Sequence, residues 1–359
     1  MISKWEFNEI SQSEWNKFET NYRSAHFLQS VQNIAMREKM GGYQNYIVGV
    51  RSGKKIIAGG VLSGRRGEFW MAYGPLIDWN DQKLVQFFLR GITSFSCEKN
   101  MLKVEIFPNA LLTVRDSKGQ ILEKHNQDKM KQIFAEAGWH YQGETVGYEM
   151  KAGRWAFTKD LSGIMSVNEL RATYRKTLRV RLRQTDGQVE IQKLKRDDLS
   201  KLVGLIDESD AHNGVNGREL DYYRAMFDAF DRDIEFLITV KSDDKTPVAG
   251  AIFIHHGNEM ASYLSGMDRH YRNLNGRAWL QDYVMQKCLK QGITRINFFW
   301  IEGKFTDNRL LEFKSGFGGV VEEYIGGFEK VLRPAEYLAR RVARKTKNLG
   351  GRLLRKISN

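Results

Sequence analysis

The hydrophobic pattern of the chain contains one arrangement twice. The first copy begins with YIVGVRSGKKIIAGGVL (Tyr46–Leu62), and the second begins with FLITVKSDDKTPVAGAIFI (Phe236–Ile254). Each copy has a run rich in β-branched residues, a polar turn that contains lysine, and a second apolar run opened by Ala-Gly. Apolar runs on either side of a short polar turn predict two antiparallel strands joined as a hairpin.

The segments after each hairpin continue the repeat. A third apolar run predicts a strand, apolar residues at helical spacing then predict a helix, and a further strand follows. These segments are residues 68–78, 84–100 and 101–107 in the first copy, and 259–268, 278–292 and 293–299 in the second. The same order of elements, repeated about 190 residues apart, predicts two copies of one α/β unit.

The length of the chain agrees with two units. A chain of 359 residues exceeds one ordinary hydrophobic core, and 42% hydrophobic residues are enough for a folded globular protein. We predict a first domain over residues 1–152 that is completed by residues 320–345, and a second domain over residues 153–319. Residues 346–359 are predicted to form a basic tail.

Charge is distributed unevenly along the chain. The formal net charge is +13 and the isoelectric point is near 9.5. One basic run, Arg171–Gln184, has no acidic residue, and a second, Arg333–Asn359, has nine Lys and Arg but only one acid. Such runs favour the phosphates of nucleic acids, nucleotides or lipid headgroups. A basic but merely solvated surface is the alternative.

Other features of composition bear on location and cofactors. The polar start, MISKWEFNEISQSEW, has no apolar core of a signal peptide, and no stretch reaches the roughly 18 apolar residues of a membrane span. Cys97 and Cys288 are not spaced as metal ligands or as a disulfide framework. We expect a monomeric cytoplasmic protein without a metal ion or a resident cofactor. Its basic end would also allow peripheral contact with the inner face of the cell membrane.

Several motifs carry a resemblance to known enzymes. An antiparallel meander followed by a helix and a further strand resembles the GNAT acyltransferase fold, in which an acyl donor binds where two central strands separate. Two such units with a late Phe-Lys motif resemble the Fem family of peptidoglycan bridge-forming aminoacyltransferases, of the type without a coiled-coil arm. The matching segments are HFLQSVQNIAMREKMGGY (His26–Tyr43), AYGPLIDW (Ala72–Trp79), HNGVNGRELDYYRAM (His212–Met226), SYLSGMD (Ser262–Asp268) and EFKSGFGG (Glu312–Gly319). The resemblance implies an α/β (α+β) fold built from tandem GNAT-like domains, with mixed sheets flanked by helices.

The resemblance also implies a reaction. The family moves an amino acid from aminoacyl-tRNA onto the stem-peptide lysine of a cell-wall precursor. For this chain it implies direct aminolysis of the ester, with aminoacyl-tRNA as co-substrate. Whether the acceptor is the UDP-linked or the lipid-linked muropeptide stays open, as do the amino acid that is transferred and its position in the bridge.

The motif with Phe313 and Lys314 matches the family's catalytic pair, in which the lysine lies against the reacting ester. The resemblance therefore implies that Lys314 supplies positive charge to the developing oxyanion, a role that is worth several kcal/mol in a water-poor cleft. Glycines beside it allow donor backbone to approach closely. The sequence offers no residue spaced as a general base or as a covalent nucleophile.

Four further positions match substrate-binding residues of the family, and one of them has two candidate residues. Arg218 and a cation on the first-domain helix, which is either Arg37 or Lys39, would hold the diphosphate of the precursor. Arginine suits such contacts because its planar fork binds phosphate bidentately. Tyr222, which follows Arg218 at i+4 on a predicted helix, and Tyr263 match tyrosines that contact the substrate.

The sequence also departs from the family pattern. Phe107 replaces an acidic residue that often precedes a proline, and Leu102 replaces a tyrosine five residues earlier. The segment FFWIEG (Phe298–Gly303) stands where a Gly-Gly pair is usual. These changes bear on recognition of the precursor more than on the chemistry.

Two other classes of function remain as alternatives. A CoA-dependent GNAT enzyme would need a glycine-rich pyrophosphate loop at the start of a helix. The closest stretch is DRHYRNLNGRAW, which has Arg272 and Gly276 but no glycine-rich run. A non-catalytic protein that binds nucleic acid or a membrane surface would rest on the basic runs alone. Turnover of acetyl-CoA would distinguish a CoA-dependent enzyme from an aminoacyltransferase. Dependence of amino-acid transfer on Lys314 would exclude a non-catalytic binding protein.

Overall fold

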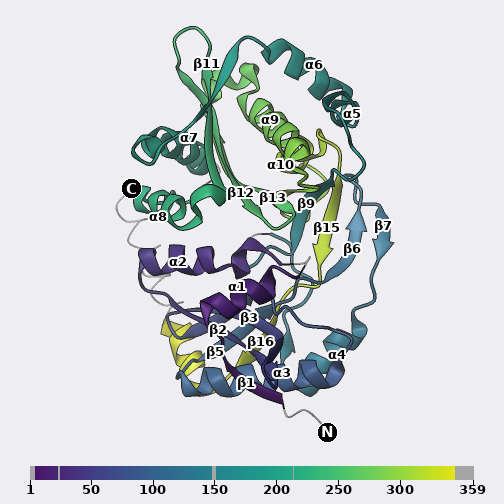
Figure 1. Cartoon of the computed structure of the whole chain (residues 1–359), viewed down its shortest axis with the longest axis vertical. Coiled ribbons are helices and arrows are strands. Elements are labelled where there is room, and N and C mark those ends of the chain that lie inside the picture. Colours follow the sequence, from purple (N-terminus) through teal and green to yellow (C-terminus); the bar gives the residue numbers. More distant parts are fainter. Residues whose placement is uncertain (1–4, 23–24, 148–150, 213, 344–359) are drawn as a thin grey trace.

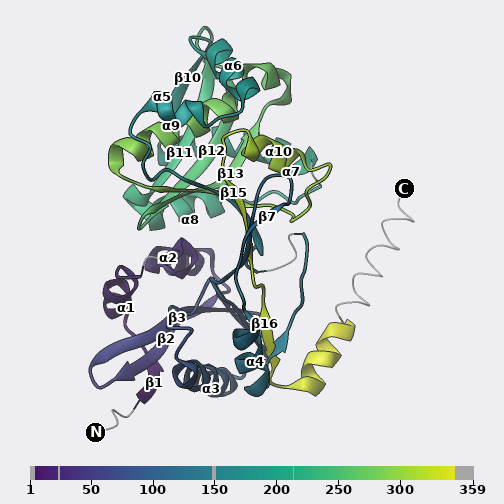
Figure 2. The same ribbon diagram turned by 90° about the vertical axis from the view of Figure 1, so that its right-hand side faces the viewer.

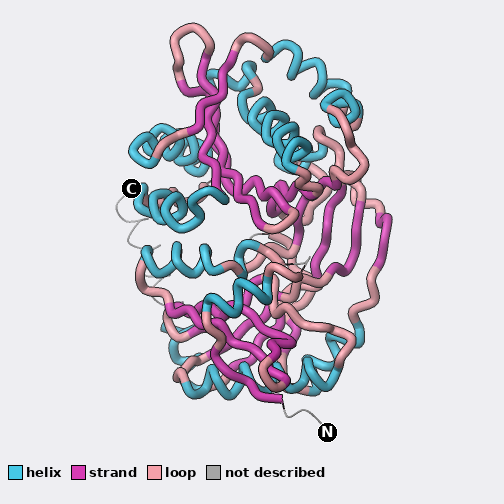
Figure 3. Tube along the Cα trace, in the orientation of Figure 1, coloured by secondary structure: helices cyan, strands magenta, loops and turns pink. Residues whose placement is uncertain are grey.

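A computed structural model describes residues 5–22, 25–147, 151–212 and 214–343. The predicted basic tail, residues 346–359, lies outside the described residues. Two β-sheets follow one another along the long axis of the molecule (Figures 1 and 2). Helices cover the faces of both sheets (Figure 3).

The first sheet has seven strands and belongs mainly to the first half of the chain. Its spatial order is β1 (Trp5–Glu9), β2 (Gln44–Ser52), β3 (Lys55–Arg65), β4 (Glu68–Ala72), β5 (Lys103–Phe107), β16 (Phe328–Val331) and β8 (His140–Tyr141). The helices of this half are α1 (Gln12–Glu19), η1 (Phe27–Gln29), α2 (Val31–Met40), α3 (Gln82–Glu98) and α4 (Asp128–Glu136). Residues 334–343 are also helical.

The second sheet has nine strands. Their order is β10 (Val189–Lys193), β11 (Ile234–Lys241), β12 (Pro247–His256), β13 (Glu259–Met267), β14 (Arg295–Trp300), β9 (Trp155–Asp160), β15 (Val320–Tyr324), β6 (Leu111–Arg115) and β7 (Ile121–Lys124). The helices of this half are α5 (Val167–Ala172), α6 (Lys176–Thr185), η2 (Arg196–Asp198), α7 (Leu199–His212), α8 (Leu220–Phe230), η3 (Asp231–Asp233), η4 (Arg269–Leu274), α9 (Gly276–Gln291) and α10 (Arg309–Ser315).

Alternation along the strands explains why each sheet is covered on both faces. Successive side chains of a strand point to opposite faces. On β2, Ile47 packs with residues of α1 and α2, whereas Val48 packs with residues of α3 and α4. On β11, Phe236 likewise packs with α7 and α8, whereas Leu237 packs with α9. A strand that is apolar on both faces is therefore buried between two helical layers.

The predicted repeat is confirmed by these elements. Strands β2 and β3 pair antiparallel, as do β11 and β12, and each hairpin is followed by a strand, a long helix and a parallel strand. The predicted fold class, mixed sheets flanked by helices in a tandem GNAT-like arrangement, is confirmed as well.

The chain crosses between the two sheets more than once. β6 and β7 lie within residues 1–152 but pair in the nine-stranded sheet, and so does β15, which lies within residues 320–345. β16 returns to the seven-stranded sheet beside β5. The two halves therefore share strands as well as a linker, while the exact domain limits remain a prediction.

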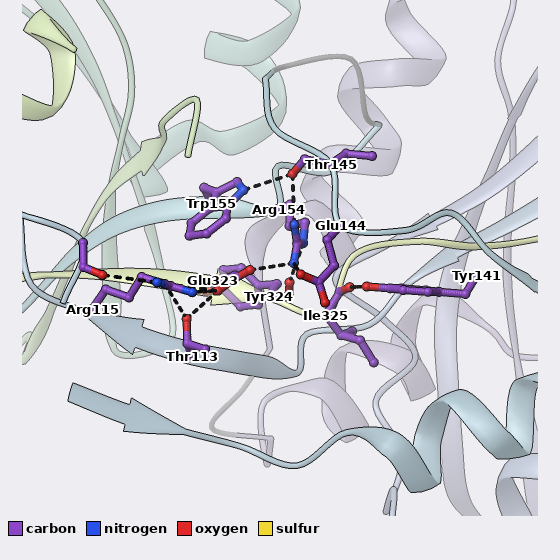
Figure 4. A network of polar contacts seen from close by, with 11 residues as sticks. Thr113, Arg115, Tyr141, Glu144, Thr145, Arg154, Trp155, Glu323, Tyr324 and Ile325 are labelled. Atoms are coloured by element: carbon purple, nitrogen blue, oxygen red, sulfur yellow. Dashed lines mark hydrogen bonds and ion pairs between the residues drawn. The ribbon is translucent and has the colours of Figure 1, made fainter. Parts of the chain in front are cut away.

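A buried polar network stabilises the region where β6, β9 and β15 meet (Figure 4). Arg154 is 3% exposed and donates from Nη2 to Oε1 of Glu323 at 2.6 Å. Arg115 donates from Nη2 to the other oxygen, Oε2, at 3.1 Å. Nε of Arg154 also donates to the Tyr324 carbonyl at 3.1 Å. Because each buried charge has a partner, the desolvation cost of the group is offset.

Among the described residues, no helix combines the length and the apolar character that crossing a bilayer requires.

Candidate active site

The site is built around a separation of two parallel strands in the second half. β13 and β14 pair only through Glu259–Ala261 and Arg295–Asn297; beyond this point β13 continues along β12, and β14 regains a partner on β9 only at Trp300. The equivalent strands of the first half, β4 and β5, stay paired along their full length. The second half therefore has an open strand pair that the first half lacks.

A β-bulge places Tyr263 at this opening. In the pairing of β12 with β13, Ile252 lies opposite Leu264 and Phe253 lies opposite Ser262, so Tyr263 is an extra residue on its strand. A bulge bends the strand and redirects the side chain at that position. The ring of Tyr263 meets the ring of Phe299, on β14, edge to face at a centroid distance of 5.1 Å.

Lys314 lies in α10, a short helix that begins after Asn308. The side chain of Asn308 accepts a hydrogen bond from the Leu311 backbone N–H at 2.9 Å and so caps the helix. Lys314 is only 7% exposed. Its Nζ donates to the backbone carbonyls of Phe299 at 3.3 Å and Trp300 at 2.8 Å, at the free end of β14. The structure thus brings Lys314 to the strand separation.

The environment of Lys314 disfavours its charge. Burial and the nearby Arg277 guanidinium lower the pKa of Lys314 to about 7. No carboxylate of the described residues forms an ion pair with it. A buried amine that lacks a counter-ion can respond strongly to negative charge that develops on a substrate.

Phe313 lies on the other side of the same turn. The guanidinium carbon of Arg277 is 4.9 Å from the centre of its ring, and the ring meets Phe317 edge to face at 5.6 Å. Phe313 therefore packs against the cation that helps to depress the pKa of Lys314. This arrangement suits a residue that positions its neighbours.

Tyr222 and Tyr263 meet at the junction of the two halves. Their hydroxyl oxygens are 2.7 Å apart. Burial, and after it the neighbouring Tyr263, raises the pKa of Tyr222 well above its ordinary value. Tyr222 lies on α8, which faces α2 of the first half (Figure 1).

Arg37 on α2 and Arg218 just before α8 converge on this tyrosine pair. Burial lowers the pKa of Arg37, while the neighbouring Tyr43, Tyr263 and Tyr222 hydroxyls act in the opposite direction. Burial also opposes the charge of Arg218, but Tyr222, Tyr263, Tyr223 and Asp210 together raise its pKa, and Oδ2 of Asp210 lies 3.4 Å from Nη1 of Arg218. The guanidinium carbon of Arg218 lies 5.5 Å from the centre of the Tyr222 ring, and Arg37 interacts electrostatically with both tyrosines, so the four side chains lie in one neighbourhood.

Lys39 lies apart from this neighbourhood. Its side chain is 47% exposed, and Nζ pairs with Oδ2 of Asp228 at 3.2 Å. Arg196 shares that carboxylate at 2.7 Å. Arg37, in contrast, donates to the hydroxyl of Ser63 and has no ion pair within the described residues. The two cations that the sequence could not separate therefore have different surroundings.

Several residues of the site were missed by sequence reasoning. Trp300 donates from its indole to the hydroxyl of Tyr73 at 2.7 Å, and Tyr73 donates to the Gly153 carbonyl at 2.8 Å. Arg277 lies beside Lys314 but is 37 residues distant in sequence. Tyr73 belonged to a quoted motif, but its partners come from distant segments. No local pattern gives such contacts.

Two of the departures from the family pattern, Phe107 and the segment Phe298–Gly303, lie close to this junction, whereas Leu102 lies at the other end of β5, hydrogen-bonded to Gly67 and Leu332. Phe107 is buried in the same apolar cluster as Tyr73 and Phe299, where it fills space that an acidic side chain could not occupy without a partner. The stretch considered as a CoA loop forms the short helix η4 before α9. Within the part of the chain that the structure describes, no group of His, Cys, Asp and Glu is arranged to hold a metal ion.

The two halves form a tandem GNAT-like fold. The FemAB family matches residues 10–240 and 237–345, so the chain belongs to the FemAB family. It is 21% identical to the aminoacyltransferase FemB of Staphylococcus epidermidis, over 92% of this chain and 96% of that relative. As a member of this family it is an aminoacyltransferase, and the resemblance inferred from the motifs is confirmed.

Solved structures support the same fold. The crystal structure of FemX superposes with a TM-score of 0.79 at 14% identity, over 93% of this chain and 99% of that one. A tandem GNAT protein from the clavulanic acid biosynthesis pathway gives a TM-score of 0.56 at 8% identity, over 92% of this chain and 99% of that one. Both likenesses extend over nearly the whole chain.

Proposed function

We propose that this protein transfers an amino acid from aminoacyl-tRNA to the stem-peptide lysine of a peptidoglycan precursor. The observation that carries the proposal is the buried Lys314 amine at the separation of β13 and β14, which has no carboxylate partner among the described residues. The names of the family's relatives support aminoacyl transfer as the class of reaction.

The reaction needs no activating group beyond the donor ester. The acceptor nitrogen attacks the ester carbonyl carbon, the bond to the ribose oxygen breaks, and an amide forms. The amine loses a proton, and the departing ribose oxygen gains one. Lys314 would bind the oxyanion of the tetrahedral intermediate, where a preorganised donor in a dry site contributes most. Phe313 would hold Arg277, and through it Lys314, in place.

The neighbourhood of these four side chains between the halves suits the diphosphate of the acceptor. Arg37 and Arg218 would share its negative charge, since arginine pairs with phosphate bidentately. Tyr222 and Tyr263 would add hydroxyl donors. We assign the first-domain cation to Arg37 and not to Lys39, because Lys39 is neutralised by Asp228 at the surface.

A panel of charged tRNAs, offered with either the UDP-linked or the lipid-linked precursor, tests the proposal by mass spectrometry. The expected product is a precursor heavier by one amino-acid residue, formed only with charged tRNA. The same panel identifies the amino acid and the acceptor. Acyl transfer from acetyl-CoA, with no transfer from any charged tRNA, would reject the proposal. The reaction would take place in the cytoplasm, where charged tRNA is made.

A further inference from the structure

Helices α5 and α6 carry a cationic surface that the reaction described so far does not use. Leu178 and Leu182 of α6 are buried against the second half. Lys176, Arg181 and Arg183 are exposed. The apolar residues Leu178 and Leu182 face the core, and every charged residue of this helix is basic. Helices α5 and α6 lie at the outer edge of the second half (Figures 1 and 2).

These three cations have no carboxylate partners among the described residues. The contrast is Arg171 on α5, whose Nη2 pairs with Asp282 at 2.6 Å. Arg179 on α6 adds a buried Nε without a hydrogen-bond partner. Like charges on one helix repel one another, so a bound anion would relieve the repulsion within this unpaired cluster.

The basic helix is connected directly to the turn that holds Lys314. The backbone N–H of Arg175 donates to the Gly316 carbonyl at 2.8 Å. Nη2 of Arg175 donates to the Ser315 hydroxyl, also at 2.8 Å. Ser315 is the residue after Lys314. The start of α6 is therefore fixed beside the proposed catalytic residue.

A hollow of about 610 Å³ lies at this connection. Lys118, Arg175 and Arg309 contribute positive charge to its lining, and Asp307 and Glu312 contribute negative charge. Phe305 provides an aromatic surface, and its ring is partly exposed. An aromatic ring beside cations is the arrangement on which single-stranded nucleotides stack.

We propose that α6 and this hollow form the docking surface for the acceptor arm of the donor tRNA. The helix would bind phosphates of the stem, and the hollow would receive the unpaired nucleotides that lead to the ester at Lys314. Helix α6 is about 15 Å long, enough to span several successive phosphates. This inference rests on the proposed function, because it requires tRNA as the donor.

An RNA partner fits this surface better than a membrane does. A helix that lies on a bilayer inserts an apolar face into the headgroup region. The apolar side of α6 is already packed in the core, and on its exposed side the large apolar residue is Val180, 40% exposed. The concave hollow beside the helix also suits a strand end better than a flat surface.

The test is a charge-reversal variant, K176E/R181E/R183E, of the full chain. With intact aminoacyl-tRNA, KM for the donor should rise about tenfold or more at low salt, because phosphate contacts dominate affinity for nucleic acid. With a short aminoacylated single-stranded oligoribonucleotide, which lacks the stem, the rate should equal that of the wild-type chain. KM for the acceptor should not change.

A matched control removes the effect of net charge alone. Lys54, Lys83 and Lys129 are exposed cations of the other half, and K54E/K83E/K129E changes the charge by the same amount. This control should retain the wild-type KM for aminoacyl-tRNA. Circular dichroism and thermal melting would show that both variants are folded.

Three outcomes would overturn the inference. The first is an unchanged donor KM in the α6 variant, and the second is an equal loss with the stemless donor. The third is loss of binding to anionic phosphatidylglycerol vesicles with unchanged kinetics toward tRNA, which would identify a membrane surface. Failure of the wild-type chain to use any charged tRNA would instead reject the proposed function, so the two failures are distinguishable.

Discussion

Nζ of Lys314 donates a hydrogen bond to the Trp300 carbonyl at 2.8 Å, and the indole of Trp300 in turn reaches Tyr73 in the other half of the molecule. A single residue, Trp300, thus connects the proposed catalytic amine to the junction of the two halves. Movement of the halves relative to each other would therefore affect the position of Lys314.

Replacement of Tyr73 by phenylalanine tests this connection. The hydroxyl of Tyr73 accepts from Trp300 and donates to the Gly153 carbonyl, so Tyr73→Phe leaves two buried groups without a partner. Chemical denaturation should show a loss of about 1–3 kcal/mol in the free energy of unfolding. Tyr283→Phe, at an exposed position, is the control and should be neutral. Equal stability of the two variants would show that the contact contributes little.

The proposed binding site for the acceptor diphosphate predicts that replacement of Arg37 and replacement of Lys39, both on α2, have different effects on KM. Arg37→Ala and Arg218→Ala should each raise KM for the muropeptide about tenfold, with a smaller effect on kcat, because phosphate contacts hold the substrate before and during the reaction. Lys39→Ala should leave KM unchanged, because Lys39 is paired with Asp228 at the surface. Steady-state kinetics of the three variants decide the matter. A raised KM in Lys39→Ala alone would reverse the assignment.

The buried network predicts a large cost for loss of one carboxylate. Glu323→Ala would leave the buried Arg154 with only the exposed Glu144 carboxylate, whose Oε2 lies 3.9 Å from Nη2, and loss of one partner of a buried pair costs about 3–5 kcal/mol. Urea denaturation measures this loss directly. Glu123→Ala removes an exposed carboxylate at the nearby β7 strand and should cost less than 1 kcal/mol. A similar small loss in both variants would argue that Arg154 finds water or another partner.

The pKa of Lys314 predicts how stability depends on pH. In the unfolded chain the amine titrates near its ordinary value of 10.5, whereas burial lowers its pKa in the folded chain to about 7. Between these values the unfolded state binds more protons, so the contribution of this group to stability rises with pH, by up to about 1.4 kcal/mol per unit. Lys314→Met removes this term.

The measurement is the difference in free energy of unfolding between Lys314→Met and the wild-type chain, taken from pH 7 to 9.5. We expect the variant to be relatively most stable near pH 7 and to lose that advantage as pH rises. A difference that is independent of pH would mean that the amine is not desolvated in the folded chain. The two chains share every other titrating group, so the contributions of groups that do not interact with Lys314 cancel in this difference.

The repeat was visible in the sequence because its signals are local. Alternating or continuous apolar runs around a lysine-containing turn, as in Tyr46–Leu62, mark strands without knowledge of their partners. The same is true of α3, whose apolar residues recur at helical spacing. The exchange of β6, β7 and β15 between the sheets could not be read in this way. Strand partners far apart in sequence are set by the packing of the whole chain.

The residues of the site show the same difference between local and long-range signals. Arg218 lies in the loop just before α8, so the predicted helical i+4 spacing to Tyr222 is wrong, although the Arg218 guanidinium carbon still lies 5.5 Å from the centre of the Tyr222 ring. The choice between Arg37 and Lys39 required the positions of Ser63 and Asp228, which come from other elements. The influence of Arg277 on Lys314 likewise depends on how α9 packs against α10. Burial and long-range pairs of this kind have no sequence signature.

The central claim is that Lys314 stabilises the transition state through its charge. Its most direct test is the single-turnover rate of aminoacyl transfer by Lys314→Met and by the wild-type chain across pH 6 to 9. Ionisation of the acceptor amine affects both proteins equally, so the ratio of the two rates isolates Lys314. We expect a wild-type advantage of about 100-fold or more below pH 7, on the scale of one lost oxyanion donor. That advantage should shrink as pH rises through about 7, because the amine of the wild-type chain then loses its charge. Equal rates for a folded Lys314→Met variant, or a ratio that grows with pH, would contradict the account.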